Sequence, residues 1–370
     1  MAAPGRIEVL EFVLINNYGS SAESRYEIYS SVETFSLYEH MFFEYMFGVA
    51  KIIDANELYN TLPITTNTYL YIKLKCPLTG RVVKSMFKIY KISDVKQESP
   101  KMQEYFIQFI SVEMFNSMRS RISKVVNGDL TKEIEQLHKS YSNKPIEVDS
   151  EALRNKIIIP FMTPLNAIKL LVKNIKWKGI MPDYCYWENL YKFNCKSISS
   201  CGINGAVHDI MTTEVYHDDK YNSYSYADYS AISEIFQPQN FDSLQSLYNG
   251  YSGSTVFTYD PITATERYEP LGNEPFAKAY AFSDTSLDYI SLSKRDQLLR
   301  SVSEKYFYVR VPGLLERTSG DIANLNIRMG NTLNIKNTEN SGRKLICGIT
   351  HQIQQSDYFQ HLTLSNYQYA

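Results

Sequence analysis

Hydrophobic and polar positions alternate with a period of two over much of the first third of the chain. The segments 68–75 (TYLYIKLK), 83–92 (VKSMFKIYKI) and 105–112 (YFIQFISV) combine this alternation with β-branched and aromatic residues, which is typical of strands. A Pro-Leu-Thr-Gly turn at positions 77–80 separates the first two segments. Residues 1–112 are therefore predicted to form a compact β-barrel or sandwich.

The pattern changes to a helical period in the middle of the chain. Asp129 is suited to cap a helix through Ser140, because its carboxylate can accept the free amides of the first turn. Thr163 and Pro164 are suited to begin a second helix, which Gly179 is expected to end. The polar residues 142–149 are expected to form a linker. Each helix has an apolar face, made of Leu130, Ile134, Leu137 and Tyr141 in the first and of Ile168, Leu171, Val172 and Ile175 in the second.

Strand-like segments return in the second half of the chain, at 184–199, 254–259, 306–311 and 325–335. The segments 344–353 and 358–364 are expected to form a closing hairpin. Helices are predicted at 241–247 and 294–303, whereas 216–229 is expected to be a loop or peripheral ribbon and 263–293 to be irregular. The predicted fold class is mainly β with α insertions (α+β).

Composition adds a bias toward aromatic residues and excludes some functions. The 370 residues include 30 Tyr and 18 Phe, and aromatic side chains favour strands and large protein–protein contacts. A net charge of −2 argues against a broad basic surface that wraps nucleic acid. We expect no signal peptide and no membrane span, because the apolar runs are too short. Five cysteines, an odd number, suggest reduced thiols and synthesis in a cytoplasm.

Residues with metal-binding side chains gather in two places. The spacing of Cys185, Cys195 and Cys201 does not match a zinc site. The other group also matches no metal motif, and a solvated loop is the favoured interpretation for it; this group consists of His208-Asp209, Glu214 and His217-Asp218-Asp219.

Catalytic motifs are not found. The chain has no GxSxG nucleophile elbow and no Walker P-loop, and the GxxG at 250–253 is interpreted as a turn before a strand. His351 lies in a strand-like run and is interpreted as a structural residue rather than as a base. We therefore assign no catalytic, cofactor-binding or metal-binding residue, and the chain is not expected to be an enzyme.

Two surface patterns have a binding alternative. Lys169, Lys173 and Lys176 share one helix face, with Lys178 beyond them, and such a face is able to meet phosphates. The favoured interpretation is the solvated side of an amphipathic helix. The Tyr-rich run at 221–229 (YNSYSYADY) has side chains that stack on sugars or bases or form a partner surface, whereas an exposed loop is the favoured interpretation.

Short motifs follow one another in order along nearly the whole chain. The first part contains Leu37-Tyr38-Glu39, Gly48, Ile52-Ile53-Asp54-Ala55, Leu62-Pro63-Ile64, and then Ser111, Glu113, Asn116, Arg121, Ser123 and Lys124. The middle contains Pro160-Phe161 and Tyr186-Trp187-Glu188-Asn189, with Phe193 and Ser197. The last part contains Phe241-Asp242, Gly250-Tyr251, Tyr259-Asp260, Val311-Pro312-Gly313, Met329-Gly330-Asn331, Ser341-Gly342, His351, Tyr358 and Leu362. Together these segments resemble the baseplate central hub of contractile-tailed phages of the T-even myophage type. Two positions depart from that pattern, since Thr66-Asn67-Thr68 replaces the usual Gly-x-Glu and Asn331 replaces the usual Asp.

The resemblance implies two tube-type β-barrel domains with helical and irregular insertions. The first barrel would cover 1–112, and a mixed helical and strand domain 113–205. The second barrel, with the C-terminal hairpin, would cover 206–265 and 300–370, around an irregular insertion at 266–299. The resemblance also implies a homotrimer whose pseudo-sixfold ring joins the sixfold tail tube to the threefold central spike.

The implied partners follow from that position in a virion tail baseplate. They are the tail tube protein, the central spike protein, the tape measure protein and the surrounding baseplate wedge proteins, with transient passage of DNA and no specific binding to it. One alternative is the hub of a phage-derived contractile particle or secretion device. Another, of a different class, is a glycan-binding or glycan-cleaving tail protein that uses the Tyr-rich region 221–259.

Overall fold

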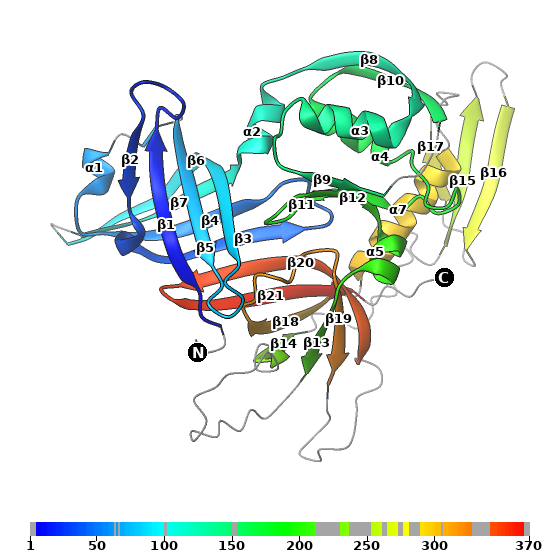
Figure 1. Ribbon diagram of the computed structural model, residues 1–370. Helices are drawn as coiled ribbons and strands as arrows, with labels where there is room; N and C mark the ends of the chain where they lie inside the picture. The colour runs from blue at the N-terminus through cyan, green and yellow to red at the C-terminus, as the bar shows by residue number, and fades with distance from the viewer. Residues whose placement is uncertain are drawn as a thin grey trace.

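The computed structural model describes residues 5–62, 64–65, 67–99, 102–149, 154–211, 230–236, 253–260, 265–272, 277–280, 289–304, 306–327 and 341–365. In Figure 1 a large sheet fills the lower left of the molecule, and a unit of helices and short strands lies above it on the right. Within these ranges, no helix has both the length and the apolar character needed to cross a membrane.

The first part of the chain is almost entirely strands, as predicted. Its alternate residues are buried; in β4, for example, Ala50 and Ile52 face the core. Gly48 is required there, because an added Cβ would lie 2.3 Å from the ring of Phe109. The elements are β1 (Glu8–Asn16), β2 (Ser24–Glu27), a short 3-10 helix (Tyr29–Ser31), β3 (Val32–His40), β4 (Phe47–Asp54), α1 (Leu58–Thr61), β5 (Thr68–Lys75), β6 (Val82–Ser99) and β7 (Met102–Ser111).

The last part of the chain continues the same sheet. The predicted closing hairpin is confirmed as β20 (Gly342–Gln354) and β21 (Asp357–Ser365), and it lies between β3 and β18 (Tyr306–Pro312). β20 pairs antiparallel with β3, with Ile349 opposite Glu39 and His351 opposite Leu37. The edges of this part are β14 (Glu234–Phe236) and β13 (Val207–Met211), and β19 (Ile322–Asn326) lies between β13 and β20.

The resulting sheet has 13 strands and joins the two ends of the chain without a break in its hydrogen bonding. Its main path runs β14-β18-β21-β20-β3-β4-β7-β6-β5-β1-β2, and β19 pairs with β20 and β13. The fold is therefore mainly β, as predicted, while the division into two barrels stays a prediction.

The middle of the chain forms a separate packed unit, which we call the middle unit (residues 112–204). Helices α3 (Leu130–Lys139) and α4 (Pro164–Val172) pack against the two-stranded ribbon of β8 (Ile122–Asp129) and β10 (Arg154–Met162). The remaining elements are α2 (Val112–Met118), β9 (Ile146–Val148), β11 (Tyr184–Glu188), β12 (Phe193–Ser197) and α5 (Ile198–Asn204).

Both predicted helix caps in this unit are confirmed. The side chain of Asp129 accepts the amide of Thr131 at 3.0 Å, and the hydroxyl of Thr163 accepts the amide of Asn166 at 3.3 Å. Pro164 occupies the first turn of α4. Each cap satisfies an amide that has no partner within its helix.

Two predictions in this unit were wrong. The second helix ends at Val172 and not near Gly179, and the amide side chain of Asn174 bonds the carbonyl of Leu170 at 2.8 Å. Such a side-chain bond competes with continuation of the helix. The expected linker at 142–149 contains β9, which pairs in parallel with β12 and so gains backbone hydrogen bonds that its polar sequence does not suggest.

The segment 263–293 was predicted to be irregular, and this was wrong as well. It contains β16 (Thr265–Gly272) and β17 (Ala277–Tyr280), which pair with β15 (Gly253–Asp260), and α7 (Tyr289–Glu304) begins within it. The strand predicted at 254–259 and the helix at 294–303 are confirmed by β15 and α7. The predicted loop at 216–229 and helix at 241–247 lie outside the described residues, as does most of the strand predicted at 325–335.

Candidate functional site

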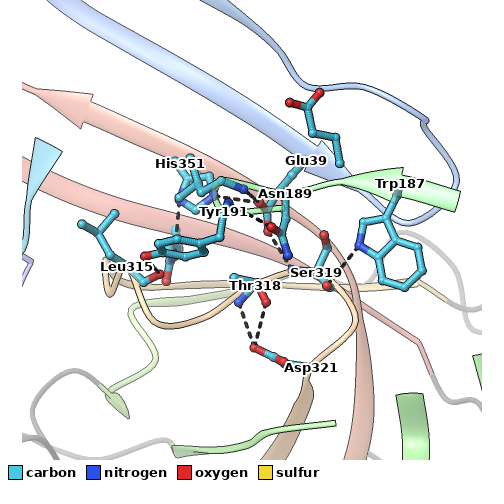
Figure 2. A network of polar contacts seen from close by, with 12 residues as sticks. Glu39, Trp187, Asn189, Tyr191, Leu315, Thr318, Ser319, Asp321 and His351 are labelled. Carbon is cyan, nitrogen blue, oxygen red and sulfur yellow. Dashed lines mark hydrogen bonds and ion pairs between the residues drawn. The ribbon is translucent and has the colours of Figure 1, made fainter. Parts of the chain in front are cut away.

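Glu39 is a buried acid at the junction of three parts of the chain (Figure 2). It lies near the end of β3 with 2% of its surface exposed. One carboxylate oxygen accepts the amide of Ser319 at 2.7 Å, and the other accepts the amide of Leu190 at 3.1 Å. Ser319 follows β18, and Leu190 is in the turn between β11 and β12. Because a buried amide without an acceptor is costly, this carboxylate ties the first strands, the middle unit and the last strands together.

Three side chains of the closing hairpin extend this network. The amide group of Gln360 donates to the hydroxyl of Tyr358 at 3.0 Å, and that hydroxyl lies 2.7 Å from Nδ1 of His351. Since the Tyr358 oxygen accepts from Gln360, its proton can be donated to Nδ1. The other ring nitrogen, Nε2, lies 3.8 Å from the Glu39 carboxylate, which is beyond hydrogen-bond distance. Burial raises the pKa of Tyr358 well above its ordinary value, so the hydroxyl keeps its proton.

Gln360 also binds the loop that follows β18. Its oxygen accepts from the amide of Leu314 at 3.2 Å and from the guanidinium of Arg317 at 3.0 Å, while its nitrogen donates to the Leu314 carbonyl at 2.8 Å. One amide side chain thus holds both backbone groups of one loop residue. We call the whole network the polar joint; it consists of Glu39, Leu190, Leu314, Arg317, Ser319, His351, Tyr358 and Gln360.

The loop around the polar joint requires glycine at two positions. Gly313 lies against Tyr358, and an added Cβ would be 2.1 Å from its ring. Gly320 has a positive φ of 96°, and a Cβ there would be 2.7 Å from the ring of Trp187. Trp187 is itself buried and donates its indole N–H to the carbonyl of Ser319 at 3.2 Å. The close approach of backbone to these rings therefore explains both glycines.

Two further contacts fix the same loop. The hydroxyl of Tyr191 donates to the carbonyl of Leu315 at 2.8 Å, and the carboxylate of Asp321 accepts the amide of Thr318 at 2.9 Å. The Asp321 carboxylate also lies 3.1 Å from Nε2 of His208. His208 was predicted to be in a solvated loop; this was wrong, because it is buried in β13, which pairs with β19.

A second buried acid connects the first strands to the middle unit. Glu188 accepts the amide of Met46 at 2.9 Å and the ammonium of Lys144 at 2.8 Å. Burial raises the pKa of Glu188, and Lys144 opposes that shift. Next to it, the hydroxyl of Tyr186 lies 2.8 Å from Nδ1 of His138, whose pKa is lowered, chiefly by burial. The hydrogen-bonding groups of this cluster find their partners within the protein, which is typical of structural polar clusters.

The order Glu39, His351, Tyr358 has the groups of a proton relay, but their burial favours a mechanical role. The exposed fraction is 2% for Glu39 and 1% for both His351 and Tyr358, so a substrate has no direct access to them in this conformation. Their hydrogen bonds connect strands instead. The interpretation of His351 as a structural residue agrees with this geometry, and the absence of enzyme activity stays a prediction.

Among the residues that the structure describes, the His, Cys, Asp and Glu side chains form no group of three or more that could hold a metal ion. All five cysteines are buried free thiols. Burial raises the pKa of the Cys185 thiol to about 12, so it remains protonated. Glu214, His217 and Asp218-Asp219 lie outside the described residues, as does the Tyr-rich run at 221–229.

The lysine face predicted on the second helix is divided by the early end of α4. Lys169 lies in the helix and pairs with Glu44 at 2.7 Å, and Lys173 is exposed at its C-cap. Lys176 and Lys178 lie beyond the helix in the turn that follows. The four lysines therefore do not form one continuous helical face.

The motif residues singled out in the sequence converge on the polar joint and its surroundings. Glu39, Gly313, His351 and Tyr358 are far apart in the chain and meet here, with Trp187 beside them. Sequence reasoning missed Arg317, Ser319 and Gln360, because no local pattern marks a side chain or amide whose partner lies 43 to 280 residues away.

Comparison with known proteins gives a fold likeness and no family assignment. No family model and no curated protein matches this chain. Three solved structures align with nearly all of it. The 43 kDa tail protein of prophage MuSo2 from Shewanella oneidensis has a TM-score of 0.61 at 9% identity, with 96% of this chain and 97% of that chain covered, and a tail protein from Neisseria meningitidis has a TM-score of 0.59 at 12% identity, with the same coverage. An E. coli component of the type VI secretion system has a TM-score of 0.51 at 9% identity, with 98% of this chain and 77% of that chain covered. The last is described as structurally similar to the bacteriophage T4 tail proteins gp27 and gp5. At these identities the likeness shows the fold.

Proposed function

We propose that this chain is the structural baseplate hub of a contractile phage tail. The observation that carries the proposal is the fold likeness to a prophage tail protein and to a second tail protein, each of which extends over 96% of the chain. Two tube-type barrels per subunit would form a trimeric pseudo-sixfold ring between the sixfold tail tube and the threefold central spike. Closed symmetric rings of this kind are common among structural oligomers.

The polar joint suits a part that transmits force. The 13-stranded sheet joins the first and last parts of the chain, and the Glu39 carboxylate ties the middle unit to both. Relative movement of these parts would leave buried amides and a buried carboxylate unpaired, which is costly. A stiff subunit of this kind supports the proposed load-bearing role at the end of a tail.

The proposed partners are the tail tube, central spike, tape measure and baseplate wedge proteins. DNA would pass through the ring without specific binding, for which the net charge of −2 is suited. The chain would be made in the host cytoplasm, become part of the virion tail and have no catalytic activity of its own.

A second candidate is the equivalent subunit of a phage-derived particle or a secretion device. The likeness to the E. coli type VI secretion component, at a TM-score of 0.51, favours it. Both candidates would have the same ring geometry, and the genes that neighbour the coding sequence would distinguish them.

The test of the proposed function is the symmetry of the purified protein in electron-microscope class averages. We expect a three-lobed ring with an open centre and six similar inner densities. If the protein alone is monomeric, the cognate spike protein is added; a chain that remains a monomer with its spike would contradict the proposal. A positive glycan array, or sugar release from cell envelopes, would favour the glycan-binding or glycan-cleaving alternative instead.

A further inference from the structure

A cavity of about 430 Å³ lies where the first strands, the middle unit and helix α7 meet. The turn after β3 contributes Met41 and Phe42, and α4, β11 and α7 supply the other walls. The volume falls within the range of about 300–1,000 Å³ that is usual for ligand pockets. Because three parts of the chain contribute to it, a molecule bound here would contact all of them.

Four cationic side chains from two helices line this cavity. Lys169 and Lys173 come from the end of α4, and Arg295 and Arg300 come from α7. A single acidic residue, Glu44, lies among the described lining residues and pairs with Lys169 at 2.7 Å. The cavity therefore carries a positive charge in a protein whose net charge is −2.

The cations surround an apolar wall. Met41 is buried, and Val172 and Leu299 also line the cavity. Both arginine side chains are half-buried, and their guanidinium groups have polar partners within the chain. Arg295 donates to the carbonyl of Pro182 at 3.2 Å, and Arg300 pairs with Asp296 at 3.1 Å. The side chains are thus held in place before any ligand binds.

The dipole of helix α4 explains the position of only two of the four cations that line the cavity. Cations at the C-terminal end of a helix interact favourably with its carbonyl groups, which accounts for Lys169 and Lys173. Arg295 and Arg300 lie in the interior of α7, so the dipole of α4 does not account for their place in the same cavity, although each also has a partner within the chain. Their convergence with the two lysines points to an external anion.

We infer that this cavity binds an acidic peptide segment of a partner protein, in which a carboxylate is adjacent to an apolar side chain. The carboxylate would meet Lys173 and the arginines, and the apolar side chain would cover the wall beside Met41. Charged groups of opposite sign give such contacts specificity. The inference does not rest on the proposed function, because it needs only the cavity of the single chain.

A nucleic acid fits the cavity less well than a peptide does. Sites that follow a phosphate backbone are extended basic stripes, whereas these cations line a single pocket. A phosphate backbone also has no apolar group to cover the wall. The peptide is therefore the occupant that matches both the charge and the apolar surface.

The test is the binding of a short fluorescein-labelled peptide of alternating leucine and glutamate to the purified chain, measured by fluorescence polarisation. A peptide with glutamine in place of glutamate is the neutral control. We expect the acidic peptide to bind at least about tenfold more tightly, and Lys173→Glu to weaken it by about tenfold, because a reversed charge removes one attraction and adds a repulsion.

Two variants make this test specific. Lys132→Glu makes the same charge change on α3, outside the cavity, where 79% of the lysine side chain is exposed, and it should change the affinity by less than about twofold. Glu44→Gln removes the competing carboxylate and should strengthen binding by about threefold.

Three outcomes would overturn the inference: equal binding of the two peptides, equal effects of Lys173→Glu and Lys132→Glu, or displacement of the peptide by a DNA duplex whose own binding is weakened by Lys173→Glu. The ring symmetry of the protein is measured separately, so failure here leaves the proposed function standing.

Discussion

The polar joint and the middle unit are stabilised in contrasting ways. In the middle unit, each helix begins at a cap whose side chain bonds an amide two or three residues away, and its apolar face packs on the ribbon of β8 and β10. In the polar joint, the partners of Glu39 are 151 and 280 residues away. The comparison teaches that local signals build the separate parts, whereas buried long-range polar contacts fix how the parts are joined.

The largest expected effect comes from removing the acceptor at the centre of the polar joint. Glu39→Ala leaves the amides of Ser319 and Leu190 buried without a partner. Each such amide costs about 1–3 kcal/mol, so we expect the free energy of unfolding to fall by about 3–5 kcal/mol. Urea unfolding followed by circular dichroism measures this.

Glu39→Gln is the matched control for that change. Its side-chain oxygen still accepts at least one of the two amides, so it should cost less than Glu39→Ala. A cost for Glu39→Ala no greater than that of losing a helix cap in the middle unit would contradict the contrast between the two regions.

A smaller effect is expected from pH at His40, which ends β3 beside the polar joint. Burial lowers the pKa of His40 from 6.5 to about 4, and its Nδ1 accepts the amide of Phe42 at 3.1 Å. The unfolded chain binds the proton first, so the contribution of His40 is fully present above pH 6.5 and is lost as the pH falls toward 4. The loss is at most about 3 kcal/mol.

The measurement compares urea unfolding of the native protein and of His40→Asn between pH 7 and pH 4, a window set by the lowered pKa of His40. Asn keeps an oxygen that is able to accept the Phe42 amide and does not titrate. The native protein should lose more stability than the variant as the pH falls, and parallel pH profiles would show that His40 is not the cause.

The smallest effect is expected at a local cap in the middle unit. Asp129→Ala removes the acceptor of the Thr131 amide at the start of α3. The amide is near the surface and water can replace the carboxylate in part, so the expected loss is about 1 kcal/mol. Thermal or urea unfolding measures it, and Asp129→Ser, which keeps a capping oxygen, should lose less than half of that amount.

The sequence pattern was sufficient for the parts of the fold that depend on neighbours in the chain. Alternation predicted the strands at 68–75 and 105–112, which became β5 and β7, and the capping residues Asp129 and Thr163 predicted where α3 and α4 begin. The sequence pattern failed where strand pairing matters more than local composition. Segments β9 and β16 are strands because a neighbouring strand offers hydrogen bonds to their backbones.

The residues of the polar joint also divide into those that the sequence marks and those that only the tertiary structure reveals. The sequence determined that Glu39, Gly313, His351 and Tyr358 are notable positions, and it determined the mainly β class of the chain. The tertiary structure alone decided that these residues meet, that Arg317, Ser319 and Gln360 complete the network, and that four cations from two parts of the chain line one cavity. The physical reason is that hydrogen bonds and charges act over a few ångströms in space, whatever the distance between their residues along the chain.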